Sequence, residues 1–238
     1  MRKKMLLKRS LLIIIIIVCT LSVRLAPSEN ASVLINEAIV PETPKEVLLD
    51  VPLLNQMDYP VLYNGCEVTS LTMILQYNNI SISKNDVAAW LPSVPIVYEN
   101  GLRGNPNDAF VGDITGYDYG FSVYHGPIVA LAANFVSSDR IKDITGSSFD
   151  AVLDAVNNGY PVWTITSTSY APVDDMEVWQ TPTGEVNVSY NEHSVVVVGY
   201  DDNYFYVNDP YGIKNQPVDK SSFIASWEQF GSQAIYIE

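Results

Sequence analysis

Hydrophobic and polar positions follow two different periods along the chain. Over residues 66–78 apolar side chains recur at steps of three and four, which predicts an amphipathic helix. Helical patterns are shorter over 126–135, and over 84–91 and 149–156, where a preceding serine can cap the helix. Residues 92–120 are rich in Pro, Gly, Asn and Asp, which predicts a long irregular segment.

From Pro161 onward the period changes to that of β-strands. The predicted strands are 162–168, 185–190, 194–199, 204–207 and 234–237. The third of these contains four consecutive valines, which predicts a strand buried on both faces. Because helices come first and strands later, the expected fold class is α+β with an antiparallel sheet.

The first 26 residues have the pattern of an export signal. Basic residues precede an apolar run, Leu11 to Val18, that is shorter than the ~20 residues of a membrane-spanning helix. The sequence before Pro27 lacks a small-x-small cleavage pattern, so an uncleaved N-terminal anchor is the alternative to a signal peptide. Polar residues 27–46 then predict a spacer, and 47–238 the folded domain. The expected location is secreted or cell-surface, with membrane contact only through the N-terminal segment.

Charge divides sharply between the N-terminal segment and the rest. Six of the 13 basic residues lie in positions 1–24, where there is no acidic residue, so the other seven face all 27 acidic residues. Such an acidic body repels the phosphates of nucleic acids and anionic lipid head groups. We therefore expect no nucleic acid partner. The excess of acidic residues is explained either by solubility alone or by a cleft that prefers cationic or neutral peptides.

Cys66 is the one cysteine after the signal, because Cys19 lies within it. The body therefore has no internal disulfide, and a lone thiol in an exported protein is exposed to oxidation. A small buried hydrophobe is one explanation. Cys66 also follows Gly65 at the start of the predicted helix, where the helix dipole lowers a thiol pKa and favours a nucleophilic thiolate.

His193 and Asp209 are predicted to meet across a β-hairpin. His193 immediately precedes the strand 194–199, and Asp209 follows the next strand, 204–207. Asp209 is then placed to accept a proton from one imidazole nitrogen and so to orient the ring. Taken singly, a lone histidine is a surface residue, and the Asn-Asp-Pro at 208–210 is a turn.

Several stretches of the chain resemble one family of peptidases. They are Val-Pro-Leu-Leu-Asn-Gln (51–56), Asn-Gly-Cys-Glu-Val-Thr-Ser-Leu (64–71), Gly-Tyr-Pro-Val (159–162), Glu-His-Ser-Val-Val-Val-Val-Gly-Tyr (192–200) and Val-Asn-Asp-Pro (207–210). Together they resemble the papain-like bacteriocin-processing (double-glycine leader) peptidases, and more closely their secreted stand-alone relatives, the peptidase family C thirty-nine-like proteins. The likeness covers about residues 47–238.

The resemblance implies a papain-like fold and assigns roles to four residues. Cys66, His193 and Asp209 would form the triad, and Gln56, ten residues before Cys66, would donate to the oxyanion of the tetrahedral intermediate. The chain departs from the leader peptidases in a longer loop between Gln56 and Cys66, and in Glu67, where they tend to have Gly. No transporter domain is attached, so a leader-peptide substrate does not follow.

The expected function is therefore an extracytoplasmic cysteine peptidase that hydrolyses peptide or protein substrates. A transpeptidase or amidase would use the same triad, since the acyl-enzyme is shared. The other alternative is a non-catalytic peptide-binding module. No cofactor is expected, and one body cysteine with two distant histidines gives no metal-ligand spacing. The second histidine, His125, has no carboxylate in its local motif, and we expect it to border the cleft or to support the loop there.

Overall fold

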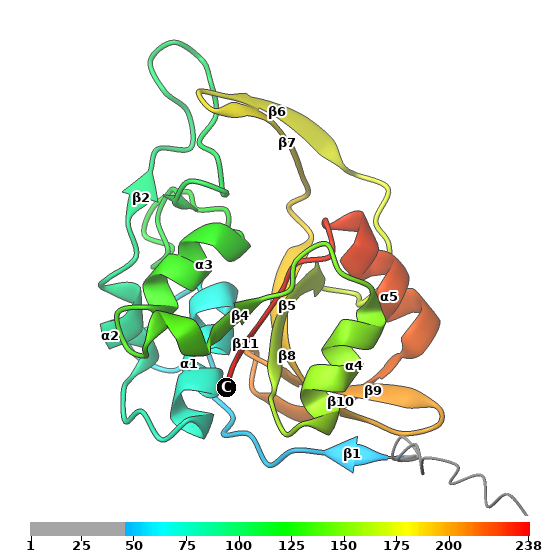
Figure 1. The fold of residues 1–238 in the computed structure, drawn as a ribbon. Helices are drawn as coiled ribbons and strands as arrows, with labels where there is room; N and C mark the ends of the chain where they lie inside the picture. The colour runs from blue at the N-terminus through cyan, green and yellow to red at the C-terminus, as the bar shows by residue number, and fades with distance from the viewer. Residues whose placement is uncertain (1–45) are drawn as a thin grey trace, which may run out of the picture. The chain divides into compact units, whose positions relative to one another are not determined.

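The protein is described here from a computed structural model, which describes residues 46–238. Helices pack against one main sheet (Figure 1). The strands of the main sheet are β1 (Val47–Leu48), β4 (Ile141–Asp143), β5 (Val162–Ser167), β8 (Glu192–Tyr200), β9 (Tyr204–Asp209), β10 (Ile213–Asp219) and β11 (Ala234–Ile237). The signal or anchor at 1–26, and the spacer 27–46 up to its last residue, lie outside the described residues.

The main sheet is antiparallel at every pairing. Its order is β10-β9-β8-β5-β11-β4, and β1 pairs with the far end of β8. Two small sheets lie outside it: β2 (Ser93–Val94) runs parallel to β3 (Phe110–Val111), and β6 (Glu177–Thr181) forms a hairpin with β7 (Gly184–Val188). β8 is thus the central strand, with long neighbours on both sides.

Helices cover both faces of the main sheet. They are α1 (Cys66–Tyr77), α2 (Lys84–Ala88), α3 (His125–Ala132), α4 (Phe149–Asn157) and α5 (Lys220–Gln229), with a short 3₁₀ turn at Ser138–Arg140. α1 and α3 lie on one face, and α4 and α5 on the other (Figure 1). This arrangement is the α+β architecture that the sequence predicts.

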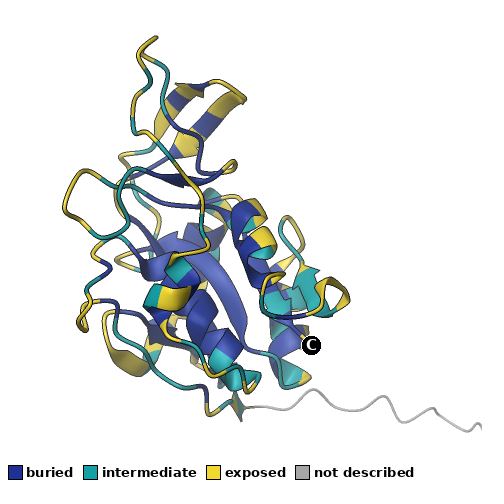
Figure 2. Ribbon diagram, turned by 90° about the vertical axis from the view of Figure 1, so that its left-hand side faces the viewer, coloured by how far each residue is buried: buried dark blue, intermediate teal, exposed yellow. Residues whose placement is uncertain are grey.

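β8 supplies side chains to both layers of the core. Val196 and Val198 belong to the cluster under α1 and α3, while Val195 and Val197 belong to the cluster under α4 and α5. This alternation is the two-residue period of a strand. Every residue of β8 is buried, as the burial colours of Figure 2 show for the strands between the helices. The prediction of a strand buried on both faces is therefore confirmed.

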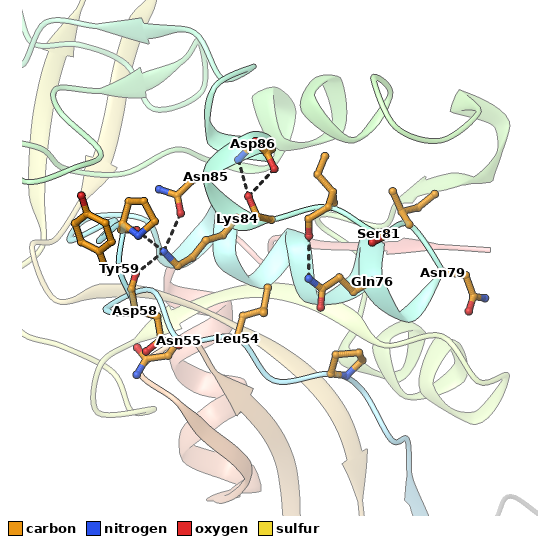
Figure 3. A pocket seen from close by; sticks show the side chains of 15 residues that line it. Leu54, Asn55, Asp58, Tyr59, Gln76, Asn79, Ser81, Lys84, Asn85 and Asp86 are labelled. Atoms are coloured by element: carbon orange, nitrogen blue, oxygen red, sulfur yellow. Dashed lines mark hydrogen bonds between the residues drawn. The ribbon is translucent and has the colours of Figure 1, made fainter.

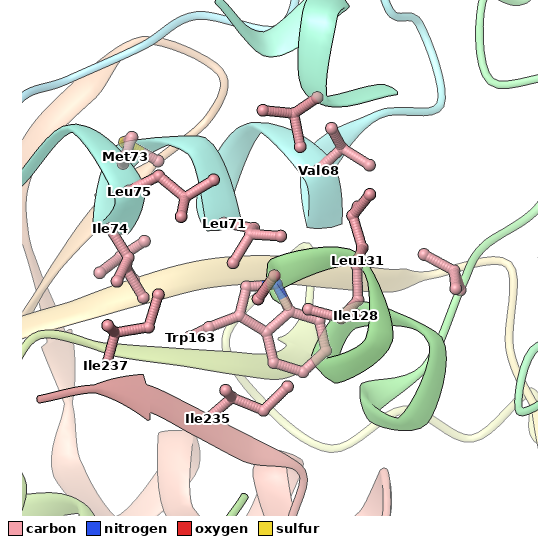
Figure 4. Close-up of a cluster of buried hydrophobic side chains, with 14 of the residues drawn as sticks. Val68, Leu71, Met73, Ile74, Leu75, Ile128, Leu131, Trp163, Ile235 and Ile237 are labelled. Atoms are coloured by element: carbon pink, nitrogen blue, oxygen red, sulfur yellow. The ribbon is translucent and has the colours of Figure 1, made fainter. Parts of the chain in front are cut away.

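A tryptophan lies at the centre of the layer under α1. Trp163 of β5 is fully buried and packs among aliphatic side chains of α1, α3 and β11, including Leu71, Ile128 and Ile235 (Figure 4). Its indole nitrogen donates to the Glu67 carbonyl at 3.0 Å. Replacing such a core side chain by alanine costs about 3–5 kcal/mol. The indole therefore fixes the first turn of α1 against the sheet.

α1 is more buried than its sequence pattern predicts. Its first ten residues are all buried, including Thr69, Ser70 and Thr72, so the helix is not simply amphipathic. Two of these polar side chains have acceptors: Thr72 Oγ1 donates to the Val68 carbonyl at 2.7 Å, and Ser70 Oγ to the Ser194 carbonyl of β8 at 3.2 Å, whereas Thr69 Oγ1 has no hydrogen-bond partner. α1 is therefore the helix that packs on β8.

Several elements were not predicted. The strands β4, β6 and β10 and the helix α5 fall in stretches without a clear apolar period. β10 is mostly exposed, and α5 buries only Phe223, Ser226 and Trp227. The segment 92–120 is irregular except for the two-residue strands β2 and β3. Among residues 46–238, no helix has the length and apolarity needed to cross a membrane.

Candidate active site

Cys66 is the first residue of α1, as predicted. Gly65 precedes it, and a Cβ there would lie 2.5 Å from the Leu62 Cβ, so only glycine fits this approach. No side chain caps the helix. The N–H groups of a first helical turn have no acceptor within the helix, so the turn that carries Cys66 offers backbone donors beside the thiol.

The thiol environment differs from the sequence-based expectation. Burial raises the pKa of Cys66 well above its ordinary value, and the neighbouring carboxyls of Glu67 and Glu192 raise it further. The predicted lowering by the helix N-terminus is therefore wrong for this structure, because desolvation of the charged form outweighs the helix dipole. The resting residue is a protonated thiol.

His193 is the second residue of β8, and its side chain is buried. Its Nε2 lies 3.1 Å from Asp209 Oδ1, across the β8–β9 hairpin. The Tyr211 ring stacks on the imidazole, with centroids 5.0 Å apart and planes inclined by 14°. With Nε2–H assigned as the donor to Asp209, Nδ1 is left as the free basic nitrogen.

Asp209, the last residue of β9, is bonded at both carboxylate oxygens. Oδ1 accepts from His193 and from the Tyr211 backbone N–H at 2.7 Å, and Oδ2 accepts from the Tyr170 hydroxyl. Burial acts to raise the pKa of Asp209, but these hydrogen bonds and the imidazole outweigh it and lower the pKa. Asp209 is therefore a carboxylate that holds the His193 ring in one orientation.

Gln56 is almost fully buried in the loop that precedes α1. Its Nε2 donates to the carbonyls of Tyr63 at 2.9 Å and Leu62 at 3.3 Å, while Oε1 has no hydrogen-bond partner. The amide therefore folds the loop back toward Cys66. Both of its hydrogens are occupied, so a bond to a substrate oxyanion requires one of them to leave its carbonyl.

One pocket brings three of the four predicted residues together. Its volume is about 190 Å³, and Gln56, Cys66 and His193 all line it, with Asp209 behind the imidazole. Other polar and aromatic side chains complete the wall: Tyr63, Asn64, Phe121, Thr168, Ser189, Tyr190, Glu192 and Tyr211. No lysine or arginine is among the lining residues.

A larger hollow of about 1040 Å³ lies on the other side of the Gln56 loop, against α2 (Figure 3). The ammonium of Lys84 donates there to the carbonyls of Asp58 at 2.8 Å and Pro60 at 2.5 Å, and to the Asn85 side chain at 3.0 Å. All three of its hydrogens are thus used within the protein. Size does not make this hollow the reactive site, because it contains no paired nucleophile and base.

The sequence analysis missed three residues that surround the imidazole and the thiol. Tyr211 covers His193, and Tyr170 donates to Asp209. Glu192 lies buried in the pocket wall beside the thiol. The position of Tyr211, two residues after Asp209, was a usable signal, whereas nothing in the sequence around Tyr170 indicates its contact.

Glu67 and Glu192 bring two buried carboxyls to Cys66. Within residues 46–238, one cluster of three His, Cys, Asp or Glu side chains has its potential metal-ligand atoms within 4.8 Å of one another. It consists of Cys66, Glu67 and Glu192. Glu67 Oε1 accepts the Val123 N–H at 3.0 Å. With Cys66 as the candidate nucleophile and Glu67 already bonded, we interpret the group as a proton-sharing cluster rather than an ion-binding site.

His125 does not line this pocket, so the first of its two expected positions, at the border of the cleft, is wrong. It begins α3, and its Nδ1 lies 2.7 Å from Asp143 Oδ2 on β4. The carboxylate partner that is missing from its local motif comes from a distant strand. His125 therefore ties α3 to the edge of the sheet.

The fold and the grouping of Cys66 with His193 define the class: an α+β chain with the architecture of papain-like cysteine peptidases. The chain belongs to the Peptidase C39-like family, whose model matches residues 48–235.

Three proteins illustrate the likeness. An uncharacterized protein of Bacillus subtilis, YvpB, is 50% identical over 190 residues, which are 80% of this chain and 75% of YvpB. The crystal structure of a C39-like peptidase from Bacillus anthracis, itself described as putative, matches 82% of this chain and 98% of its own, with 39% identity and a TM-score of 0.77. Xylellain, a cysteine protease from Xylella fastidiosa, matches 83% of this chain and 87% of its own, at 12% identity and a TM-score of 0.42, too remote to bear on the site.

Proposed function

We propose that this protein is a cysteine peptidase that hydrolyses peptide bonds, with Cys66 as nucleophile and His193 as general base. The observation that carries the proposal is the pocket that Cys66 and His193 both line, with the imidazole hydrogen-bonded to Asp209. A nucleophile, a base and an orienting group are thus gathered at one pocket, as acyl transfer requires.

The reaction begins from a neutral thiol. As Cys66 Sγ attacks the substrate carbonyl carbon, its proton passes to His193 Nδ1, and the carbonyl oxygen becomes an oxyanion. The imidazolium then protonates the leaving amine, the C–N bond breaks, and a thioester remains on Cys66. Water, deprotonated by His193, attacks the thioester and releases the acid and the thiol. The Asp209 carboxylate stabilises the imidazolium in both stages.

The oxyanion requires donors aimed at the point where its charge develops. The backbone N–H of Cys66, at the start of α1, is one candidate. Gln56 is the second, and it joins by releasing its longer bond, the one to the Leu62 carbonyl at 3.3 Å. Its shorter bond to the Tyr63 carbonyl then keeps the amide in place.

We infer the substrate class from charge. The pocket has no lysine or arginine in its wall, and the chain beyond residue 24 is strongly acidic. Peptides that are neutral or cationic near the scissile bond are therefore favoured over acidic ones. The basic and apolar pattern of residues 1–26 supports work outside the cytoplasm, whether the protein is secreted or attached at the surface.

The test is cleavage of a diverse peptide pool by the reduced full-length protein, with new termini identified by mass spectrometry. We expect cuts across pH 5 to 8 that vanish in Cys66→Ala, a variant that loses one small side chain and should remain folded. Ligated products at the same sites would indicate a transpeptidase, because the thioester can pass to an amine. Binding of peptides without new termini, in both proteins, would contradict the peptidase and leave a binding module.

A further inference from the structure

Two buried carboxyls lie beside the candidate nucleophile and base. Glu67 is the neighbour of Cys66 in α1, and Glu192 is the neighbour of His193 in β8. The exposed fractions of Glu67 and Glu192 are 0% and 9%, and their oxygens lie within 4.8 Å of each other and of the thiol. Two carboxyls that are so close together and so deeply buried cannot both be ionised, because each negative charge disfavours the other.

The hydrogen bonds assign the proton. Glu67 Oε1 accepts the Val123 N–H at 3.0 Å, whereas its Oε2 and Glu192 Oε1 are buried with no other partner. Among the described residues neither carboxyl has a cationic partner. One proton shared between Glu67 Oε2 and Glu192 Oε1 would give each of these oxygens a hydrogen-bond partner. Glu67 has the backbone donor and is the carboxylate, so Glu192 is the acid.

The groups around the pair do not supply a competing charge. Cys66 faces it from α1, Tyr124 from the start of α3 and Tyr211 from beyond β9, and all three are neutral at neutral pH. The Ser122 hydroxyl lies against both carboxyls. Burial raises the pKa of Glu67 and raises that of Glu192 well above its ordinary value, and the charge of Glu67 adds to the latter.

We propose that Glu67 and Glu192 are positioning residues that share one proton and thereby hold the Cys66 end of α1 against the His193 end of β8. The effect of the shared proton on turnover rests on the proposed function, but the existence of the shared proton does not. Two other contacts join these elements: the Ser194 backbone N–H donates to the Cys66 thiol, and Ser70 Oγ donates to the Ser194 carbonyl one turn further along α1. Loss of the proton places two like charges in contact and pushes the two ends apart.

The first readout is the wild-type, full-length protein itself. At pH 7 its infrared spectrum should contain the carbonyl band of a protonated carboxyl, which is absent in Glu192→Gln and retained in Glu228→Gln, an exposed control. Because the folded pKa is raised above 4.5, the unfolded state loses its proton first. The contribution of the shared proton to stability is therefore fully present below pH 4.5. It is lost as the pH rises from there through the raised folded pKa, and the unfolding equilibrium constant increases by up to tenfold per pH unit for one proton.

The variants separate a shared proton from simple packing. In Glu192→Gln the amide donates to the Glu67 carboxylate without a proton to lose, so the fall in stability above pH 4.5 should disappear. In Glu67→Gln the charge moves to Glu192, which lacks the backbone donor, so this variant should be the less stable of the two. Glu192→Ala should lower kcat about a hundredfold at little change in KM, the scale of a 1 Å misplacement, and Glu192→Gln should recover most of that loss.

The outcomes keep the two proposals apart. No protonated-carboxyl band in wild type, or the same pH slope of stability in wild type and Glu192→Gln, would overturn the shared proton whatever the activity. A band and slope as expected, in a protein that never cuts peptides, would retain the shared proton and remove the peptidase. Equal kcat in Glu192→Ala and wild type would overturn the positioning role.

Discussion

At the scale of single residues, the protonation of Cys66 decides how the thiol reacts. Burial and the neighbouring carboxyls raise its pKa, so little thiolate is present at neutral pH. We expect iodoacetamide to label Cys66 more slowly than a free cysteine at pH 6 to 7, and to accelerate as the pH rises beyond the free-thiol value of about 8.5.

The labelling is read by mass spectrometry at the peptide that contains Cys66. The full-length chain also contains Cys19, so Cys66→Ala is the control that separates the two sites. Fast labelling at pH 6 that disappears in His193→Ala would contradict a neutral resting thiol. It would show instead that the imidazole holds a thiolate as an ion pair.

The two histidines provide the second test at this scale. His193→Ala removes the base and should reduce kcat by several orders of magnitude, as removal of one member of a catalytic unit does. His125→Ala breaks only the contact with Asp143 at 2.7 Å and should retain most of the activity, at a small cost in stability because the pair is partly exposed. Kinetics on one cleaved peptide decide the matter, and the reverse ranking would exclude His193 as the base.

The pairing of His193 with Asp209 could be predicted because one hairpin joins them, and the length of its strands sets their distance. The contact between Glu67 and Glu192 could not. Acidic residues in a sequence are expected at the surface, and these two are far apart along the chain. Only the packing of α1 on β8 brings them together, and only burial shows that they need a shared proton.

At the scale of elements, α2 anchors the loop that carries Gln56. Lys84→Met keeps the length of the side chain but removes the donors to the Asp58 and Pro60 carbonyls. We expect a loss of about 1.5–3 kcal/mol in unfolding free energy, because the hydrogen bonds of a buried charged group are lost. We also expect a lower kcat, because the loop that presents Gln56 to the pocket is loosened.

Ser83→Ala is the matched control for this prediction. It removes the N-cap of α2, where Ser83 Oγ accepts the Asp86 N–H at 3.2 Å, and costs about 1 kcal/mol without touching the loop. Urea unfolding measures the stability of both variants, and steady-state kinetics measure kcat. An unchanged kcat in Lys84→Met at full folding would show that the loop holds its shape without the ammonium.

Elements were predictable where a burial pattern identified them. β8 contains four consecutive valines, 195–198, and β11 is an apolar run at the end of the chain, so both were found. α5 was missed because its sequence, Lys-Ser-Ser-Phe-Ile-Ala-Ser-Trp-Glu-Gln, buries one edge only. β10 contains Pro217 and is largely exposed, so its pairing with β9, rather than its own side chains, makes it a strand.

At the scale of the whole molecule, the main sheet separates two packing layers and places the site at one end of its central strand. The strands β5, β8 and β11 contribute side chains both to the cluster under α1 and to the cluster under α4. The position of Cys66 therefore depends on the α1 layer, and that of His193 and Asp209 on the sheet. Sequence patterns predicted the class of fold, but this division of the site between two units of packing required the three-dimensional arrangement.

β1 joins the sheet at the opposite end of β8 from the imidazole. Val47 and Leu48 pair with Tyr200 and Gly199, where a Cβ on Gly199 would lie 2.2 Å from the Val47 carbonyl oxygen. Six residues of strand, roughly 20 Å, separate this pairing from His193. A protein attached through the residues before β1 is therefore held at the end of the sheet remote from its reactive groups. Linking it to a solid support through its N-terminus would leave the pocket accessible to peptides.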